Sequence, residues 1–246
     1  MIVIRSAEEI LKIKKAGSII RSTLAKLKKY IKPGTETIEL DRIAREEILK
    51  RDGYPAFKNY RGYPGNICVS VNEVVVHGIP SERRLREGDI VSIDVGVRFR
   101  DYFADAAVTV GVGSISDKAS RLIETTQKAL YTGIRNAVSG KRLGDISAGI
   151  QAFVESNGFS VVRAFVGHGI GTKIHEEPEI PNFGKPGIGP RLEAGMILAI
   201  EPMVNAGSYE VEVLEDGWTA VTKDRRLSAH FEHTVAVADG KAEILT

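Results

Sequence analysis

The sequence predicts an α/β protein of the α+β kind, in which a curved, mainly antiparallel sheet is covered on its outside by helices. The order helix, helix, strand, hairpin occurs twice in the 246 residues. Successive strands then pair as neighbours, which argues against a doubly wound parallel sheet. A ten-residue pattern also recurs, with Leu85-x-x-Gly88-x-Ile90-x-x-Ile93-Asp94 returning as Leu192-x-x-Gly195-x-Ile197-x-x-Ile200-Glu201. This repetition predicts two equivalent halves related by a pseudo-two-fold axis.

The first half begins with two helices. Apolar residues at helical spacing predict a helix from Ile10 to Ile31, which Pro33-Gly34 ends. A second helix starts near Thr35 or Thr37, either of which is a suitable N-cap, and ends at Asp52-Gly53. Aromatic- and glycine-rich loops follow. The predicted strand at 67–71 and the predicted hairpin of 90–99 with 102–110 complete this half.

The second half repeats this order. One helix begins at Ser116 or Asp117 and has Gly140 behind it, and a shorter helix ends at Gly158. Strands are predicted at 161–166, 196–204, 210–213, 219–221 and 231–237, with a proline- and glycine-rich loop at 178–190. No low-complexity linker separates the halves. We therefore expect a single domain over residues 1–246, with internal halves of about 1–112 and 113–246.

Composition is typical of a soluble globular protein, with 43% hydrophobic and 27% charged residues. A single cysteine, Cys68, excludes an internal disulfide and favours a reducing compartment. The N-terminus carries charges where a signal peptide needs its apolar stretch, and no run approaches the ~18 apolar residues of a membrane span. These features predict a cytoplasmic protein without membrane contact. Since no long apolar surface stripe is left unassigned, we expect a monomer.

Acidic residues stand where buried strands should be apolar. Asp94 and Glu201 end the two copies of the repeat, and Asp105 precedes a pair of valines just as Glu232 does. About a common axis, these four acids would converge in one interior. Isolated ionised carboxylates are very costly in a low-dielectric core, and no lysine or arginine lies within three residues of any of the four to pair with them. The acids therefore predict a metal site.

The hairpin turn, centred near Phe99-Arg100, would make Asp94 and Asp105 direct cross-strand partners that share a cation. His168 follows the predicted strand at 161–166 and can reach the same interior. Four carboxylates carry a charge of about −4, which two divalent cations neutralise. Carboxylate-rich ligation with one imidazole suits Mn, Fe, Co or Zn and does not choose among them.

The other histidines divide into two groups. His77 and His175 lie in loop-like segments, where functional groups concentrate, and we interpret them as groups that bind and polarise a substrate. His230 and His233 flank Glu232. Strand alternation is expected to direct both of them to the opposite face, so both are interpreted as structural.

Taken together, these residues resemble those of the type I methionine aminopeptidases. The resemblance spans essentially the whole chain. It rests on the order of the five candidate ligands, on residues 70–80 (SVNEVVVHGIP), and on residues 167–171 (GHGIG) followed by His175-Glu176. It implies the pita-bread fold. It also implies removal of the initiator methionine from nascent proteins when the second residue is small and uncharged.

The resemblance further implies a role for each ligand. Asp94 would chelate one metal, Asp105 and Glu232 would bridge both metals, and His168 and Glu201 would complete the second. Glu201 would also take the proton from the bridging water, as the resulting hydroxide attacks the first peptide bond.

Substrate contacts are implied in the same way. His175 would hydrogen-bond the developing oxyanion, and His77 would contact the scissile amide nitrogen or the next residue. The methionine side chain would enter an apolar pocket lined by Tyr60, Tyr63, Cys68, Trp218 and Phe57. Ile174 would also line this pocket, at a position where bacterial relatives often carry an aromatic residue. Asn72, Val74 and Ser228 match a monovalent-cation site seen in some relatives.

Three alternatives stay open. A prolidase or X-prolyl aminopeptidase would share the fold, although those chains usually bring an additional N-terminal domain. A non-catalytic binding protein on the same scaffold would be expected to have lost ligands, and here all five are present. A structural calcium-binding domain would have no use for His168.

Charge is unevenly spread along the chain. Residues 1–32 contain nine basic and two acidic residues, although the net charge of the whole chain is only +2. A solvated helix face is the ordinary interpretation of such a segment. For an enzyme that meets nascent chains, contact with ribosomal RNA is the alternative.

Overall fold

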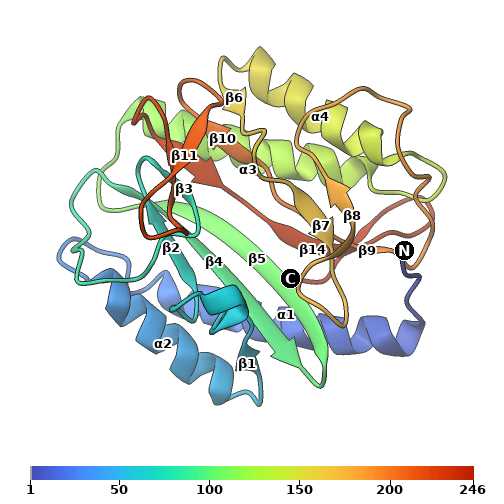
Figure 1. Ribbon diagram of the computed structural model, residues 1–246, viewed down its shortest axis with the longest axis horizontal. Helices are drawn as coiled ribbons and strands as arrows, with labels where there is room; N and C mark the ends of the chain where they lie inside the picture. Colours follow the sequence, from blue (N-terminus) through green and yellow to red (C-terminus); the bar gives the residue numbers. More distant parts are fainter. Residues whose placement is uncertain (1) are drawn as a thin grey trace.

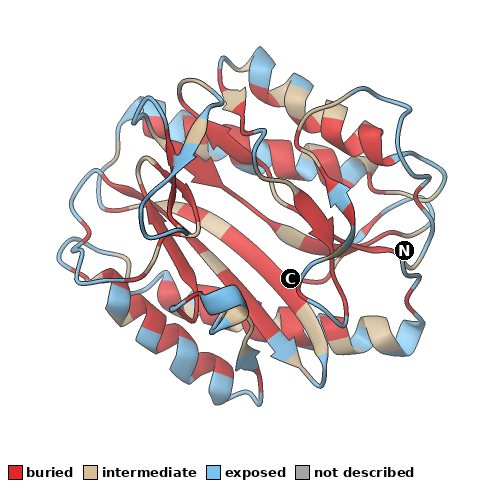
Figure 2. Cartoon of the chain, in the orientation of Figure 1, coloured by how far each residue is buried: buried red, intermediate tan, exposed pale blue. Residues whose placement is uncertain are grey.

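The computed structural model describes residues 2–246. Helices α1 (Ala7–Leu27) and α2 (Thr37–Leu49) lie along one side of the molecule, and α3 (Asp117–Asn136) and α4 (Leu143–Ser156) lie along the other, with the strands between them (Figure 1). Buried residues follow the strands and the inward faces of the helices, whereas exposed residues lie on outer helix faces and loops (Figure 2). This arrangement confirms the predicted fold class.

Local sequence signals fix most helix starts. Ser6 caps α1 by accepting the Glu9 N–H, and the Glu9 carboxylate accepts the Ser6 N–H in return. The start of α2 differs from the prediction. Thr37 is the first helical residue rather than the cap, because its hydroxyl donates to the Ser81 carbonyl (3.0 Å) instead of binding its own helix.

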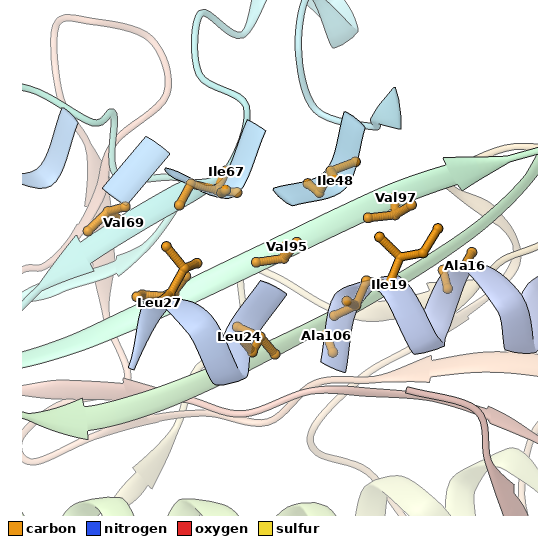
Figure 3. Packing of buried hydrophobic residues seen from close by; sticks show 14 of the residues in the cluster. Ala16, Ile19, Leu24, Leu27, Ile48, Ile67, Val69, Val95, Val97 and Ala106 are labelled. Carbon is orange, nitrogen blue, oxygen red and sulfur yellow. The ribbon is translucent and has the colours of Figure 1, made fainter. Parts of the chain in front are cut away.

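The first-half sheet is built around a long hairpin. Strands β4 (Ile90–Phe99) and β5 (Tyr102–Gly111) pair along their whole length, and the other edge of β4 pairs with β1 (Tyr54–Pro55) and β2 (Cys68–Val71). Helix α1 covers this sheet, with Leu24 and Ile19 packed near Val95 and Val97 (Figure 3). Burying one such side chain contributes about 1.5–3 kcal/mol. The hairpin that carries Asp94 is therefore held against a dense core.

The remaining strands form one sheet of five strands and two sheets of three strands. Their orders are β15-β14-β9-β7-β8, β13-β10-β6 and β11-β12-β3. The bounds are β3 (Val74–Val76), β6 (Ser160–Val161), β7 (Gly167–Gly169), β8 (Glu176–Ile180), β9 (Ile197–Ile200), β10 (Met203–Asn205), β11 (Val211–Val213), β12 (Ala220–Thr222), β13 (Ser228–His230), β14 (His233–Ala236) and β15 (Glu243–Ile244). A 3-10 turn, η1 (Tyr60–Gly62), follows β1.

Two predicted strands are interrupted at the candidate ligands. The strand predicted at 196–204 divides into β9 and β10 at Glu201-Pro202, where proline has no N–H to give to a ladder. The strand predicted at 231–237 begins only at His233, after Phe231 and Glu232. The pairs β9·β14 and β10·β13 keep one register, which sets Glu201 across from Glu232. Each of these acids thus occupies a gap between paired strands.

A seam joins β5 to the β13–β14 segment. The Glu232 N–H donates to the Ala107 carbonyl (2.9 Å). The Asp105 N–H donates to the Thr234 hydroxyl (3.0 Å), which itself donates to the Asp105 carbonyl (2.9 Å). These bonds bring Asp105 of the first half close to Glu232 of the second half.

The basic N-terminal segment is partly neutralised by acids from elsewhere. Arg5 binds Glu176 with a nitrogen–oxygen distance of 2.7 Å, and Lys26 binds Glu47 at 3.1 Å. The excess of positive charge read along residues 1–32 is therefore smaller at the surface. Within residues 2–246, no helix is both long enough and apolar enough to cross a membrane.

Candidate metal centre

The five candidate ligands come from both halves and line one cavity. Asp94 lies on β4, Asp105 on β5 and His168 on β7, while Glu201 and Glu232 occupy the two strand gaps. Asp105 and Glu232 are each 2% exposed and His168 is 7% exposed. Asp94 and Glu201 are half-buried. The structure therefore gathers residues that lie up to 138 positions apart (94 to 232) in one interior.

The two aspartates of the hairpin are not direct partners. Asp94 pairs with Ala107, and Asp105 pairs with Gly96, so the predicted direct pairing is wrong by two residues. The turn is Arg100-Asp101, one position later than expected, and both of its residues have positive φ. Asp94 and Asp105 are diagonal neighbours instead. Because side chains alternate with period 2, they still share one face of the hairpin.

Distances around His168 define the centre. Its Nε2 lies 3.5 Å from Asp105 Oδ2 and 3.5 Å from Glu201 Oε1. Asp105, His168 and Glu232 each offer a ligand atom, and these three atoms lie within 4.8 Å of one another. The His168 Nδ1 lies 2.9 Å from the Gly169 carbonyl, to which only a protonated nitrogen can donate. That bond leaves Nε2 unprotonated and free to bind a metal.

The charges of the acids are not balanced by the protein. Burial is the main cause that raises the pKa values of Asp94, Asp105 and Glu232 and brings that of Glu201 to about 8. Repulsion from neighbouring carboxylates adds to the rise for Asp94, Glu201 and Glu232. The buried Asp94 Oδ1 has no hydrogen-bond partner in residues 2–246. Divalent cations would neutralise the buried carboxylates and would also give Asp94 Oδ1 a partner. These residues therefore fit a metal site.

Metal binding should therefore release protons. Because burial raises the pKa of Glu201 to about 8, the metal-free protein keeps a proton on this carboxylate at pH 7, and a cation must displace it. We expect the Mn²⁺ affinity to rise between pH 6 and pH 8 and to level off above the pKa of Glu201. Calorimetric titration in buffers of different ionisation enthalpy measures the number of protons released. A pH-independent affinity without proton release would contradict the raised pKa values.

Two histidines approach the cavity from its loops. His77 follows β3 with φ of 60°, a strained conformation for a residue with a Cβ, and its ring packs edge-on against Phe165. The ring of His175 lies 4.3 Å from that of His168, centroid to centroid. Desolvation is the main cause that lowers the pKa of His77 to about 4 and that of His175 to about 3. Both imidazoles are therefore neutral at pH 7.

Tyr60 makes a contact that the sequence did not indicate. Its hydroxyl lies 2.8 Å from His175 Nδ1, and η1 holds it there between Asn59 and Arg61, which both have positive φ. If the hydroxyl donates to Nδ1, the proton of the neutral imidazole stays on Nε2.

For the methionine removal that the resemblance implies, the Tyr60→Phe variant should lower kcat by about 2- to 10-fold, the value of one hydrogen bond. KM should change little, because the aromatic ring remains. Steady-state kinetics on the metal-loaded enzyme measure both constants. Unchanged kcat with a raised KM would instead assign Tyr60 to substrate binding alone.

The cavity beside the ligands has a volume of about 270 Å³. Five of the six predicted pocket residues line it, as do both histidines: Phe57, Tyr60, Tyr63, Cys68, Trp218, His77 and His175. Tyr63 is held by hydrogen bonds from its hydroxyl to the Ile67 and Gly78 carbonyls, and its ring meets Trp218 edge-on at 5.2 Å. The pocket wall is therefore fixed by the fold.

Ile174 does not line this cavity. It is 3% exposed and belongs to the core cluster that includes residues of α1 and the hairpin, and it lines the neighbouring cavity beside Tyr60 and His175. Its role as a pocket residue stays a prediction. Phe165 and Met203 line the cavity in its place, although the sequence analysis did not name them. The strand predicted at 161–166 is also wrong, because β6 ends at Val161 and the following apolar residues form a cavity wall.

The interpretation of His230 must be corrected. It stands two residues before Glu232, so strand alternation places it on the same face, not the opposite one. Its Nε2 lies 3.3 Å from Glu201 Oε2. His233 does point elsewhere, since its Nδ1 lies 2.9 Å from the Thr246 hydroxyl oxygen.

The segments of the predicted monovalent-cation site lie close together. The carbonyl of Asn72 accepts the Ser228 N–H (2.8 Å), which joins the turn before Val74 to the start of β13. The cation itself stays a prediction.

Comparison with known proteins agrees with this geometry. The family model described as metallopeptidase family M24 matches residues 11–239. The chain is 55% identical to a methionine aminopeptidase of Clostridium perfringens and 51% identical to methionine aminopeptidase 1 of Bacillus subtilis, in each case over 100% of this chain and 99% of the relative.

Solved structures give the same result. A methionine aminopeptidase of Thermotoga maritima superposes with a TM-score of 0.99 at 48% identity, over 100% of this chain and 99% of that one. A prolidase of Pyrococcus furiosus has a TM-score of 0.80 at 23% identity, over 99% of this chain and 65% of that one, which shows the shared fold alone. The chain thus has the pita-bread fold and belongs to metallopeptidase family M24, among the methionine aminopeptidases.

Proposed function

We propose that this protein removes methionine from the N-terminus of peptides and nascent proteins whose second residue is small and uncharged. One observation carries the proposal: four acids and one imidazole from both halves converge at a cavity of about 270 Å³ that is otherwise lined by aromatic and apolar side chains. The acids suit cations, and the wall suits an unbranched thioether, which makes favourable contacts with aromatic rings.

The protein is a metallopeptidase, and its ligands are suited to divalent cations. Asp94, Asp105, His168, Glu201 and Glu232 would hold them, with Asp94 nearer to one cation, His168 and Glu201 nearer to the other, and Asp105 and Glu232 shared. When bound, such cations lower the pKa of water and polarise the scissile carbonyl. The arrangement suits two ions, because four carboxylates would leave one divalent ion with a surplus of about two negative charges. Mn, Fe, Co and Zn remain equally compatible.

The protein's own groups would carry the proton steps. Glu201 is placed to accept a proton from the attacking water, because its carboxylate faces His168 on the metal side. His175, held by Tyr60, would donate Nε2–H to the oxyanion. His77, at the other side of the cavity, would contact the scissile amide nitrogen or the residue after it.

Three short peptides test this function. Chelator-treated protein should cleave Met-Ala-Ser only after Mn²⁺, Fe²⁺ or Co²⁺ is restored. Acetylated Met-Ala-Ser should be untouched, because its blocked amine cannot bind a cation. Faster release of Ala from Ala-Pro peptides than of Met from Met-Ala-Ser would instead favour the X-prolyl alternative. Absence of all cleavage with metal bound would favour a non-catalytic binding protein.

Contact with the ribosome is a finer proposal. It rests on the basic residues of 1–32, of which Arg5 and Lys26 are already paired with acids. Co-sedimentation with ribosomes should weaken as salt rises, since phosphate contacts release counterions. Absent or salt-insensitive binding would count against it.

A further inference from the structure

One imidazole at the centre lies outside the five-ligand set. His230 is 2% exposed, and its Nε2 is 3.3 Å from Glu201 Oε2. The other carboxylate oxygen, Glu201 Oε1, is 3.5 Å from His168 Nε2. The two oxygens of Glu201 therefore have different neighbours, one on the side of the ligand His168 and one on the side of His230.

The position of His230 is fixed by its backbone. Its N–H donates to the Thr109 hydroxyl oxygen (2.9 Å), and that hydroxyl lies 2.8 Å from the His230 carbonyl, to which it donates. Thr109 is itself 2.8 Å from the Ser92 hydroxyl on β4. The seam between the halves thus holds His230 at a set distance from the metal centre.

The Nε2 of His230 faces a carboxylate oxygen of Glu201. It forms no hydrogen bond of good geometry in residues 2–246, and it is shielded from solvent. A buried donor without a partner costs about 1–3 kcal/mol. Glu201 Oε2, at 3.3 Å, is the charged oxygen that it faces. A small rotation of the carboxylate would complete the bond.

We propose that His230 is a positioning residue, which donates Nε2–H to Glu201 Oε2 and thereby turns Oε1 toward the metal side. Carboxylates that bind metals are commonly oriented by such outer donors, and loss of one costs about 10- to 100-fold in metal affinity. The inference rests on the proposed role of Glu201 as a ligand. It adds a donor that neither the sequence motifs nor the comparisons assign.

A matched pair of substitutions separates this role from packing. Gln and Met have nearly the same length and volume, but only Gln carries an N–H donor. We expect His230→Gln to keep the Mn²⁺ affinity within about 3-fold of the wild type, and His230→Met to lower it by about 10- to 100-fold. Calorimetric titration of chelator-treated protein measures both affinities without relying on activity.

His233→Met is the internal control. His233 flanks Glu232 on its other side, is also partly buried, and bonds to Thr246 rather than to the centre. Its substitution should leave the Mn²⁺ affinity unchanged. Equal losses in His230→Gln and His230→Met, or no loss in His230→Met, would overturn the inference. If the wild type itself bound no Mn²⁺, the proposed metal site would fail instead.

The wild-type protein offers a readout that needs no folded variant. With ¹⁵N-labelled histidine and bound Zn²⁺, NMR reports which ring nitrogen of His230 carries the proton. We expect Nε2 to be protonated and its proton to shift downfield through the bond to a carboxylate. A bare Nε2 in the metal-loaded protein would refute the proposed donation.

Discussion

Replacing Glu201 with Gln should lower kcat for Met-Ala-Ser by about 10³- to 10⁴-fold, the upper range for loss of a general base. The amide keeps the size of the side chain and one oxygen that can face the metal side, but it cannot accept a proton. The carboxylate lies on the metal side of the cavity, with Oε1 3.5 Å from His168 Nε2.

Kinetics at saturating Mn²⁺, with metal content measured in parallel, test this expectation. A Glu201→Gln enzyme that binds metal but loses activity supports the role of proton acceptor. One that loses its metal as well shows that the ligand role dominates. Activity within tenfold of the wild type would contradict both roles.

The second large effect is expected at His175. His175→Ala should lower kcat by about 10²- to 10³-fold with a smaller change in KM, because removal of one preorganised oxyanion donor acts on the transition state. The ring of His175 packs against the ring of His168, and its Nδ1 is hydrogen-bonded to the Tyr60 hydroxyl. These two contacts fix the orientation of the ring and therefore of its Nε2.

His233→Ala provides the matched control for this variant, since His233 bonds to Thr246 away from the cavity. It should retain wild-type kcat. A His175→Ala enzyme with unchanged kcat and only a raised KM would assign His175 to ground-state binding.

Several elements could be predicted from the sequence for clear physical reasons. Strand β4 has the predicted bounds, because a nearly continuous run of buried residues ends at a turn with two positive-φ positions. The four acids could be recognised because each interrupts an apolar strand pattern, which is costly unless a ligand compensates. The duplicated pattern ending at Asp94 and Glu201 correctly indicated that both halves contribute to one interior.

Other features depend on information that lies outside local patterns. A short apolar run such as residues 164–166 can build a cavity wall or a strand, and periodicity does not distinguish the two. The break at Pro202 moves Glu201 into a gap, an effect of one missing N–H within a longer apolar run. The contact between Tyr60 and His175 joins residues 115 positions apart and requires the folded loops.

The role of His230 could have been found from the sequence. It stands two residues before Glu232, and period-2 alternation places both on one face. A histidine on the same face as Glu232 indicates a side chain that can contact one of the four carboxylates.

Anomalous diffraction from crystals grown with excess Mn²⁺ tests the central claim most directly. We expect two peaks about 3.5–4 Å apart, the spacing of two-metal sites. Asp105 and Glu232 should lie between the two peaks, Asp94 should contact one of them, and His168 and Glu201 should contact the other. Data that show these carboxylate oxygens turned toward solvent, with no anomalous density between them, would contradict the account.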